Sequence, residues 1–177
     1  MVAVETLRVK NLNKTFGGLE AVKGVSFSVK EGSIFGLIGP NGAGKTTTFN
    51  IIAGAEKPTS GSVYLNDEDI TGLSSEKLYK LGLVRTFQLS HEYPKMTSLE
   101  NLMVAAPDQP GERIFMNWLS PKTVVSREKE VLERALDSLN FLGLYQVKDE
   151  LAGNLSGGQK KLLELGRTMM TDATLVL

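Results

Sequence analysis

Hydrophobic and polar residues alternate along the first 30 positions of the chain. The stretches LRVKNL at 7–12 and VKGVSFSV at 22–29 have the period of two that is typical of half-buried strands, and a turn-like FGG at 16–18 separates them. The next run, SIFGLIG at 33–39, is apolar almost throughout, which predicts a strand buried on both faces. The beginning of the chain is therefore expected to be rich in β-structure.

Two more strands and then a helix are predicted after residue 60. GSVYLND at 61–67 and KLGLVRTFQ at 80–88 predict two more strands, and a helix is predicted from Ser126, with Glu130 and Arg134 four residues apart. One face of that helix is apolar: Val131, Leu132, Ala135, Leu136, Leu139 and Leu142. Residues 107–122 contain three prolines and are predicted to form a loop or a pair of short helices.

Composition narrows the class of protein. The chain has 177 residues, of which 41% are hydrophobic, so we expect one soluble domain. The 20 basic residues equal the 20 acidic ones, which argues against a nucleic-acid partner. The sequence has no cysteine, Glu5 interrupts any signal-peptide pattern, and no run of 18 apolar residues occurs. These observations favour the cytoplasm, with membrane contact only through other subunits.

Residues 39–46 match the phosphate-loop pattern G-x-x-x-x-G-K-[ST]. The match, GPNGAGKT, follows the apolar run 33–39 and precedes the helical TTTFNIIAG. Glycines allow backbone N–H groups to surround a phosphate, Lys45 would reach the outer phosphates, and Thr46 would bind Mg²⁺ through its hydroxyl. Thr47 is expected at an inner phosphate. A glycine-rich turn without a ligand is the alternative, but it leaves the Lys-Thr pair unexplained. The predicted phosphate-binding residues are Gly39, Pro40, Asn41, Gly42, Ala43, Gly44, Lys45, Thr46 and Thr47.

A second candidate site is the pentamer LSGGQ at 155–159. Ser156 is expected to cap a helix that runs to about Met170, while Gly157 and Gly158 leave the first N–H groups open to an anion, with Gln159 beside them. The alternative is an ordinary N-cap on a core helix whose inward residues are Leu162, Leu165 and Met169. That alternative does not account for the paired glycines.

Together these motifs resemble those of the ATP-binding cassette (ABC) ATPases. GPNGAGKTT, LSGGQ and the intervening Gln88 have the family's order and spacing, over nearly the whole chain. The resemblance implies an α/β fold: a P-loop core sheet with an N-terminal antiparallel β part, and a helical subdomain. It also implies one domain over 1–177, with a core lobe at 1–88 and 166–177 and a helical lobe at 89–165.

The resemblance also implies roles for single residues. Gln88 would sense the γ-phosphate and bind the metal, and with Lys45 it would contribute to catalysis. Phe16 would stack on adenine, although by sequence alone it could equally belong to the core. His91, the only histidine, is expected to be a solvated loop residue and not the family's switch histidine.

Several stretches look most like the ATPase subunits of branched-chain amino acid importers, with urea and amide importers as close cousins: VRTFQ, MTSLENLMVA and LSGGQKKLLELGR. The implied ligands are ATP and Mg²⁺. The implied partners are an identical or sister ATPase in a head-to-tail dimer, membrane permeases, and indirectly a substrate-binding protein. The implied location is the inner face of the cell membrane. A non-transport ABC protein and a non-catalytic nucleotide-binding module are the alternatives.

The family places a metal-binding Asp, a water-activating Glu and a switch His after a strand like ATLVL at 173–177. Asp172 precedes that strand and Glu164 lies in the predicted signature helix, so neither replaces them. We therefore expect residues 1–177 to be an ATPase shortened at the C-terminus, which binds ATP but hydrolyses it inefficiently.

Overall fold

The computed structural model describes residues 5–86, 92–107, 109 and 121–177. The chain forms two compact units. The sheet unit comprises the residues up to Arg85 together with Ala173–Leu177, and the helical unit comprises Thr86–Asp172. The division of one domain at 88 and 165, made from the sequence, stays a prediction.

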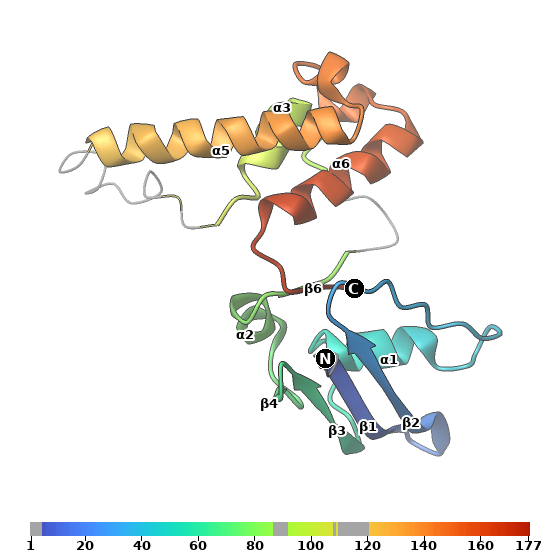
Figure 1. Ribbon diagram of the computed structural model, residues 1–177. Coiled ribbons are helices and arrows are strands. Elements are labelled where there is room, and N and C mark those ends of the chain that lie inside the picture. Colours follow the sequence, from blue (N-terminus) through green and yellow to red (C-terminus); the bar gives the residue numbers. More distant parts are fainter. Residues whose placement is uncertain (1–4, 87–91, 108, 110–120) are drawn as a thin grey trace. The chain divides into compact units, whose positions relative to one another are not determined.

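The sheet unit is built on four antiparallel strands. These are β1 (Glu5–Phe16), β2 (Leu19–Lys30), β3 (Ser60–Leu65) and β4 (Glu68–Asp69), in the order β2-β1-β3-β4 (Figure 1). Strands β1 and β2 form a hairpin in which Phe16 pairs with Leu19, and Gly17 supplies the positive φ of 55° that the tight turn needs. The predictions of strands at 7–12, 22–29 and 61–67 are confirmed.

Helix α1 (Lys45–Ile52) supplies apolar residues to the core of this unit. Ile51 and Ile52 of the helix join alternate residues of the strands, where Leu7 pairs with Leu65 and Val9 pairs with Val63. Because inward and outward positions alternate along β1, one face of the strand contributes to the core and the other carries polar residues. This core places the beginning of α1 at the end of the loop from Gly39.

The remaining elements of the sheet unit are short. Helix α2 (Ser75–Lys80) precedes β5 (Leu83–Val84), which pairs in parallel with β6 (Leu175–Val176). Of the predicted strand at 80–88, the described part, residues 80–86, contains the two residues of β5, and Asp172 precedes β6 as expected.

The prediction of a doubly buried strand at 33–39 is wrong. Residues 33–40 have no regular secondary structure, and the side chains of Ile34 and Ile38 are 104% and 94% exposed. Phe35 stacks on Phe27 of β2, with 5.0 Å between the ring centroids. A run of apolar residues becomes a buried strand only where neighbouring strands pair with it, and none of the described strands pairs with this one.

The helical unit contains three α-helices and two short 3₁₀ turns in its described part. These are α3 (Ser98–Met103), α5 (Pro121–Phe141), η2 (Tyr145–Val147), η3 (Ala152–Asn154) and α6 (Gly157–Met170). Figure 1 shows α3, α5 and α6 packed side by side, and one apolar cluster joins them. None of the described helices combines the length and apolar character needed to cross a membrane.

Helix α5 confirms the predicted helix and begins five residues earlier, at Pro121, where proline is favoured. Its innermost residues are Val131, Ala135 and Leu139, all from the predicted apolar face. Glu130 forms its ion pair with Arg127 at 2.9 Å, whereas Arg134 donates to the Met170 carbonyl at 3.3 Å, so the pairing of Glu130 with Arg134 is not formed.

Helix α6 begins after Ser156 and ends at Met170, as predicted, but it turns a different face inward. Leu163, Gly166 and Met170 are buried, whereas the side chains suggested as inward by the alternative interpretation are exposed: Leu162, Leu165 and Met169. A Cβ atom at Gly166 would lie 2.9 Å from Leu142 and 3.3 Å from Leu102. The small residue therefore sets the close approach of α6 to its neighbours, and this fixes the buried face.

Candidate nucleotide-binding site

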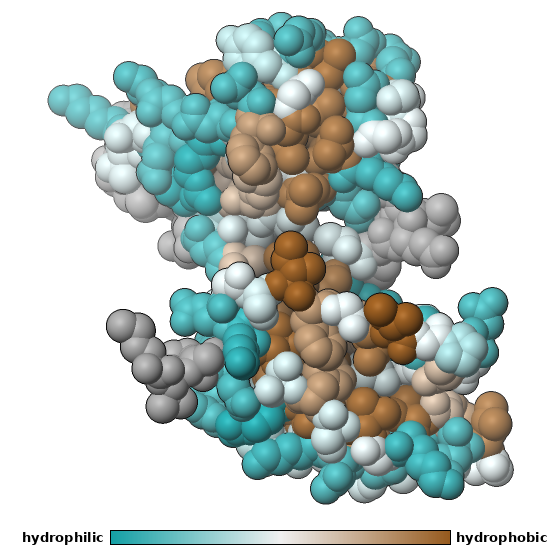
Figure 2. Space-filling view, turned by 45° about the vertical axis from the view of Figure 1, so that its right-hand side comes forward, coloured by the Kyte–Doolittle hydropathy of each residue, from teal (hydrophilic) through white to brown (hydrophobic). Residues whose placement is uncertain are grey.

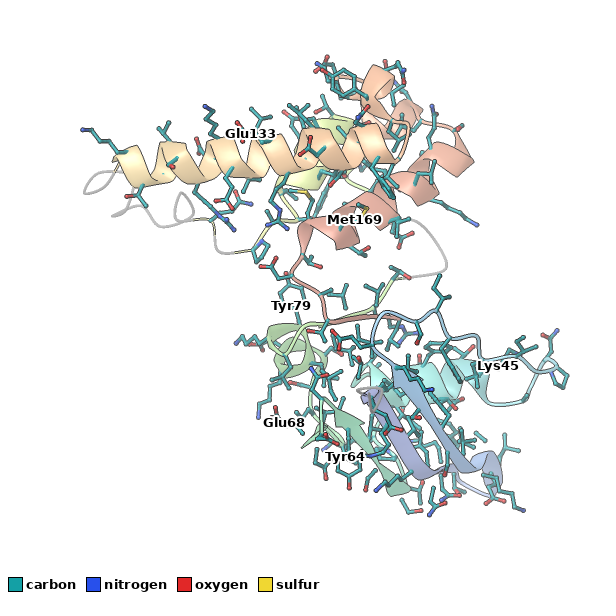
Figure 3. All side chains as sticks on the ribbon, viewed as in Figure 1. Lys45, Tyr64, Glu68, Tyr79, Glu133 and Met169 are labelled. Atoms are coloured by element: carbon teal, nitrogen blue, oxygen red, sulfur yellow. The ribbon has the colours of Figure 1, made fainter. Side chains whose placement is uncertain are left out.

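The predicted phosphate loop lies in the sheet unit and leads directly into α1. Figure 3 shows Lys45 at the beginning of this helix. Gly42 and Gly44 have φ angles of 84° and 79°, which is the left-handed region that favours glycine. An N–H···O bond of 3.2 Å from Ala43 to Pro40 closes the turn between them. Pro40–Ala43, at the tip of this loop, are exposed at the surface.

Gly44 is required for a second reason, which is the close approach of β2. A Cβ atom at this position would lie 2.3 Å from the carbonyl oxygen of Ala21 and 3.2 Å from Val22. At Gly42, by contrast, no described atom lies within 4 Å of the position of a Cβ. The absence of a side chain at Gly44 therefore allows the loop to pack closely against β2, while Gly42 faces open space.

The N-terminus of α1 has the properties of an anion site. Among the described residues, no side chain caps it and no acidic residue lies in its first turn. Its N–H groups and the positive end of its dipole are thus available for a negatively charged group. Thr46 is exposed in this first turn and Thr47 is half-buried.

Thr48 fixes the end of the loop by hydrogen bonds to Gly44, a role that the sequence analysis missed. Its buried hydroxyl donates to the Gly44 carbonyl at 2.9 Å, and its N–H donates to the same oxygen at 2.8 Å. The third threonine of the TTT run was the available signal, because a threonine four residues after Gly44 can reach the Gly44 carbonyl.

Lys45 closes the loop on itself. Its ammonium donates to the carbonyl oxygens of Gly39 and Pro40, at 2.7 Å each. These two bonds place the positive charge within the ring of the loop, beside the N-terminus of α1. A phosphate that enters the loop would compete with two neutral carbonyls for this ammonium, and charged acceptors form the stronger bonds.

Phe16 lies at the end of β1 and is 45% exposed, so it does not belong to the apolar core. The ammonium of Lys14 is 4.7 Å from the centroid of its ring. The structure thus presents Phe16 as a surface aromatic group in the same unit as the phosphate loop.

The LSGGQ motif lies in the helical unit, where it begins α6. Ser156 is the N-cap: its hydroxyl accepts from the N–H of Gln159 at 3.3 Å, and its own N–H donates to Oε1 of Gln159 at 2.9 Å. This reciprocal pair is a capping box. It confirms the predicted cap and gives Gln159 a structural role that the sequence did not reveal.

Neither packing nor backbone conformation explains the two glycines of the motif. No described atom lies within 4 Å of a Cβ built at Gly157 or Gly158, and neither has a positive φ. Both are exposed. The space above them is open to a group from outside the helical unit.

Two charged contacts, also unforeseen, connect α6 to the segment after residue 91. Lys160 pairs with the carboxylate of Glu92 at 2.9 Å, and the guanidinium of Arg167 lies 4.9 Å from the ring centroid of Tyr93. Asn101 fixes the backbone of this segment, because its side-chain amide bonds to the N–H and the carbonyl of Tyr93 at 2.8 and 3.0 Å. The residue that follows LSGGQ is therefore tied to the beginning of the helical unit.

Gln88 and His91 lie outside the described residues, so their predicted roles stay predictions. In the part of the chain that the structure describes, no cluster of three His, Cys, Asp or Glu side chains could hold a metal ion. Asp172 pairs with Arg134 at 3.5 Å, and Glu164 lies within α6. Among the predicted metal ligands, the structure thus describes the Thr46 hydroxyl.

A separate groove of 830 Å³ lies in the sheet unit, beside the segment 33–37. Its lining includes Phe27, Ile34, Phe35, Leu37 and Leu175. Figure 2 shows hydrophobic side chains gathered on the surface of this unit. Polar residues, among them Lys30, Glu31 and Ser33, complete the lining, and none of residues 39–47 belongs to it.

Known proteins resemble this chain in sequence and in fold. The sequence pattern of the ABC transporter family matches residues 22–177. One relative is a probable branched-chain amino acid transport ATP-binding protein, LivG, from Methanocaldococcus jannaschii. The two sequences are 43% identical over 174 residues, which cover 98% of this chain and 67% of the LivG protein. The LivG protein of Archaeoglobus fulgidus is 44% identical, with coverage of 98% and 66%. The chain thus spans about two thirds of the length of these relatives.

Solved structures give the same picture. The ADP conformation of an ATP-binding cassette of an ABC transporter superimposes with a TM-score of 0.73, at 42% identity, over 94% of this chain and 65% of the other. A dimeric cassette in a post-hydrolysis state, bound to ADP and Pi, gives a TM-score of 0.70 at 25% identity, over 96% and 72%. The α/β fold expected from the sequence is confirmed.

Proposed function

Because the chain belongs to the ABC transporter family, we propose that it is an ATP-binding subunit whose phosphate loop holds MgATP. The observation that carries this proposal is the uncapped N-terminus of α1 directly after a loop with left-handed glycines at 42 and 44. Backbone N–H groups would surround the β- and γ-phosphates there. Lys45 would exchange its two carbonyl partners for phosphate oxygens.

Magnesium would be held by the Thr46 hydroxyl and by phosphate oxygens, since Mg²⁺ prefers oxygen ligands and keeps several waters. Thr46 is suited to this role by its place in the first turn of α1 and by its exposure. Gln88, which lies outside the described residues, is the second ligand in this proposal. The metal would neutralise charge between the outer phosphates.

The second half of the nucleotide site is proposed to come from another ATPase chain. The hydroxyl of Ser156 accepts the N–H of Gln159, so its own proton can still be donated to a γ-phosphate oxygen. The open space above Gly157 and Gly158 gives room for that phosphate. A head-to-tail dimer, of identical or sister subunits, would place Lys45 of one chain and Ser156 of the other at each ATP.

The proposed process is import of branched-chain amino acids or related amides, since the two named relatives are described as branched-chain amino acid transport proteins. Membrane permeases would form the pathway, a substrate-binding protein would deliver the cargo, and this chain would sit on the inner face of the membrane. Uptake of labelled leucine by cells that express the complete transporter tests this proposal. Lys45→Ala should abolish leucine uptake, and uptake that survives this substitution would contradict it.

Nucleotide binding by residues 1–177 is tested by measuring ATP retention and phosphate release together. We expect retention of MgATP that Lys45→Ala abolishes, because the ammonium is the only side-chain cation placed in the described loop. We expect phosphate release about 10²- to 10⁴-fold slower than that of a typical ABC ATPase, because the two carboxylates considered as replacements for the water-activating Glu, Glu164 and Asp172, belong to the helical unit and not to the unit that carries the phosphate loop. Rapid release that depends on Lys45 would contradict this part of the proposal.

A further inference from the structure

Lys14 lies against the ring of Phe16. The two residues are two positions apart on β1, and the register of the hairpin shifts between Lys14 and Thr15. The ammonium is 4.7 Å from the ring centroid, within the range of a cation–π contact. Since Phe16 is 45% exposed, the ring has a cation on one face and solvent beside it.

The position of this ammonium is fixed by the segment that follows α1. It pairs with the carboxylate of Glu56 at 3.1 Å and donates to the carbonyl of Lys57 at 2.7 Å. The Lys14 side chain is only 13% exposed, which is low for a lysine on a surface strand. Two acceptors and burial hold the charge in one place, so the ring beneath it is restrained too.

The contacts therefore run from the aromatic ring to the helix that begins at the phosphate loop. Glu56 and Lys57 come shortly after the C-cap of α1 at Ala53, and α1 begins at Lys45. A neighbouring contact strengthens the same junction, because the N–H of Thr15 donates to the hydroxyl of Thr59 at 3.0 Å. The end of β1 is thus joined to residues 56–59, the segment that follows α1.

We propose that Lys14 is a positioning residue that sets the ring of Phe16 for stacking on the adenine of ATP. This inference rests on the proposed nucleotide-binding function. The ammonium restricts the ring to one orientation, which reduces the entropy lost on binding. It also draws electron density toward the covered face, so the opposite face becomes a better partner for an electron-rich purine. Lys14 acts through Phe16 and does not contact the nucleotide.

The test compares a ligand that has a base with one that lacks it. Affinities for ATP and for inorganic tripolyphosphate are measured by calorimetry for the unaltered chain, Lys14→Met, Lys14→Arg, Phe16→Ala and the double variant Lys14→Met with Phe16→Ala. We expect Lys14→Met to weaken ATP binding about two- to fivefold and to leave tripolyphosphate binding unchanged. Lys14→Arg should restore ATP affinity. In the Phe16→Ala background, Lys14→Met should have no further effect.

Three outcomes overturn the inference. Equal weakening of both ligands would mean that Lys14 contacts phosphate or supports the fold. Additive effects in the double variant would mean that Lys14 acts independently of Phe16. Unchanged ATP affinity in Lys14→Met, while Phe16→Ala weakens it, would remove the role of Lys14 alone.

The proposed function is judged separately. If Phe16→Ala leaves ATP affinity unchanged, adenine stacking by Phe16 fails, whereas loss of binding in Lys45→Ala still supports the phosphate loop. Thermal melting of each variant accompanies the titrations. Lys14→Gln, which keeps a donor for the Lys57 carbonyl without the charge, replaces Lys14→Met if the latter lowers the melting temperature.

Discussion

Gly42 and Gly44 have nearly the same backbone conformation but different surroundings. Both have φ near 80°, at 84° and 79°, but only Gly44 has a neighbour, the Ala21 carbonyl, 2.3 Å from the position of a Cβ. A substitution at Gly42 therefore measures the stability lost through left-handed strain alone. A substitution at Gly44 measures that loss together with the cost of the close contact. The pair thus separates two reasons for a glycine in one loop.

We predict that Gly42→Ala lowers the free energy of unfolding by about 1 kcal/mol, from left-handed strain alone. Gly44→Ala should lower it by at least about 2 to 3 kcal/mol, because the backbone of β2 must move as well. Urea denaturation of both variants measures the difference. Equal losses would mean that the contact of Gly44 with β2 relaxes without cost.

The phosphate-loop residues could be predicted from the sequence because their chemistry depends on spacing along the chain. Glycines, a lysine and a threonine at fixed intervals specify the loop and the beginning of α1. The closure of Lys45 on two carbonyls could not be predicted, because it depends on the path of the loop backbone. The contact of Lys14 with Phe16 could not be predicted either, because the ammonium is held in place by Glu56 and Lys57, which are distant in the sequence. Thr48 shows an intermediate case, since its partner is four residues away and local geometry alone supplies it.

At the scale of elements, α6 begins with glycines that its own unit does not need. Alanine is a better helix former than glycine, and no described atom would obstruct a Cβ at residue 157. We predict that Gly157→Ala raises the free energy of unfolding by about 0.5 to 1 kcal/mol. The same change should weaken ATP-dependent dimerisation, because the methyl group would occupy the approach to the first N–H groups. Melting temperature and sedimentation with MgATP measure the two effects.

The matched control is Gly166→Ala, on the same helix. There a Cβ would lie 2.9 Å from Leu142, so this variant should be destabilised. If Gly157→Ala leaves ATP-dependent dimerisation unchanged, the glycines of LSGGQ are not needed for nucleotide.

Two elements show that a sequence pattern predicts whether a helix or strand forms better than it predicts which residues are buried. The apolar run at 33–39 has the composition of an interior strand, but its partners are not a property of the run, and Ile34 and Ile38 are exposed. In α6 the alternative interpretation turned Leu162, Leu165 and Met169 inward. Gly166 decides the buried face instead, because helices approach most closely where side chains are smallest. The β1–β2 hairpin needed no such outside information, since its turn and its alternation lie in one stretch.

At the scale of the molecule, the apolar surface of the sheet unit has a measurable consequence. Ile34 and Ile38 are almost fully exposed beside a groove of 830 Å³. We predict that residues 1–177 bind the dye ANS and lose solubility as concentration rises. Replacing Ile34 and Ile38 together by serine should reduce ANS fluorescence without lowering the melting temperature, because neither side chain is buried. A monodisperse protein that does not bind ANS would contradict this prediction.

The two carbonyl bonds of Lys45 also bear on selection among cellular anions. A loop whose ammonium has two acceptors at 2.7 Å presents no bare charge to chloride or inorganic phosphate. A small anion would have to replace those bonds with few of its own, whereas a triphosphate offers oxygens to Lys45 and to several N–H groups of the loop and α1 together. The geometry of the loop therefore favours an extended polyanion, such as a triphosphate, over chloride or inorganic phosphate.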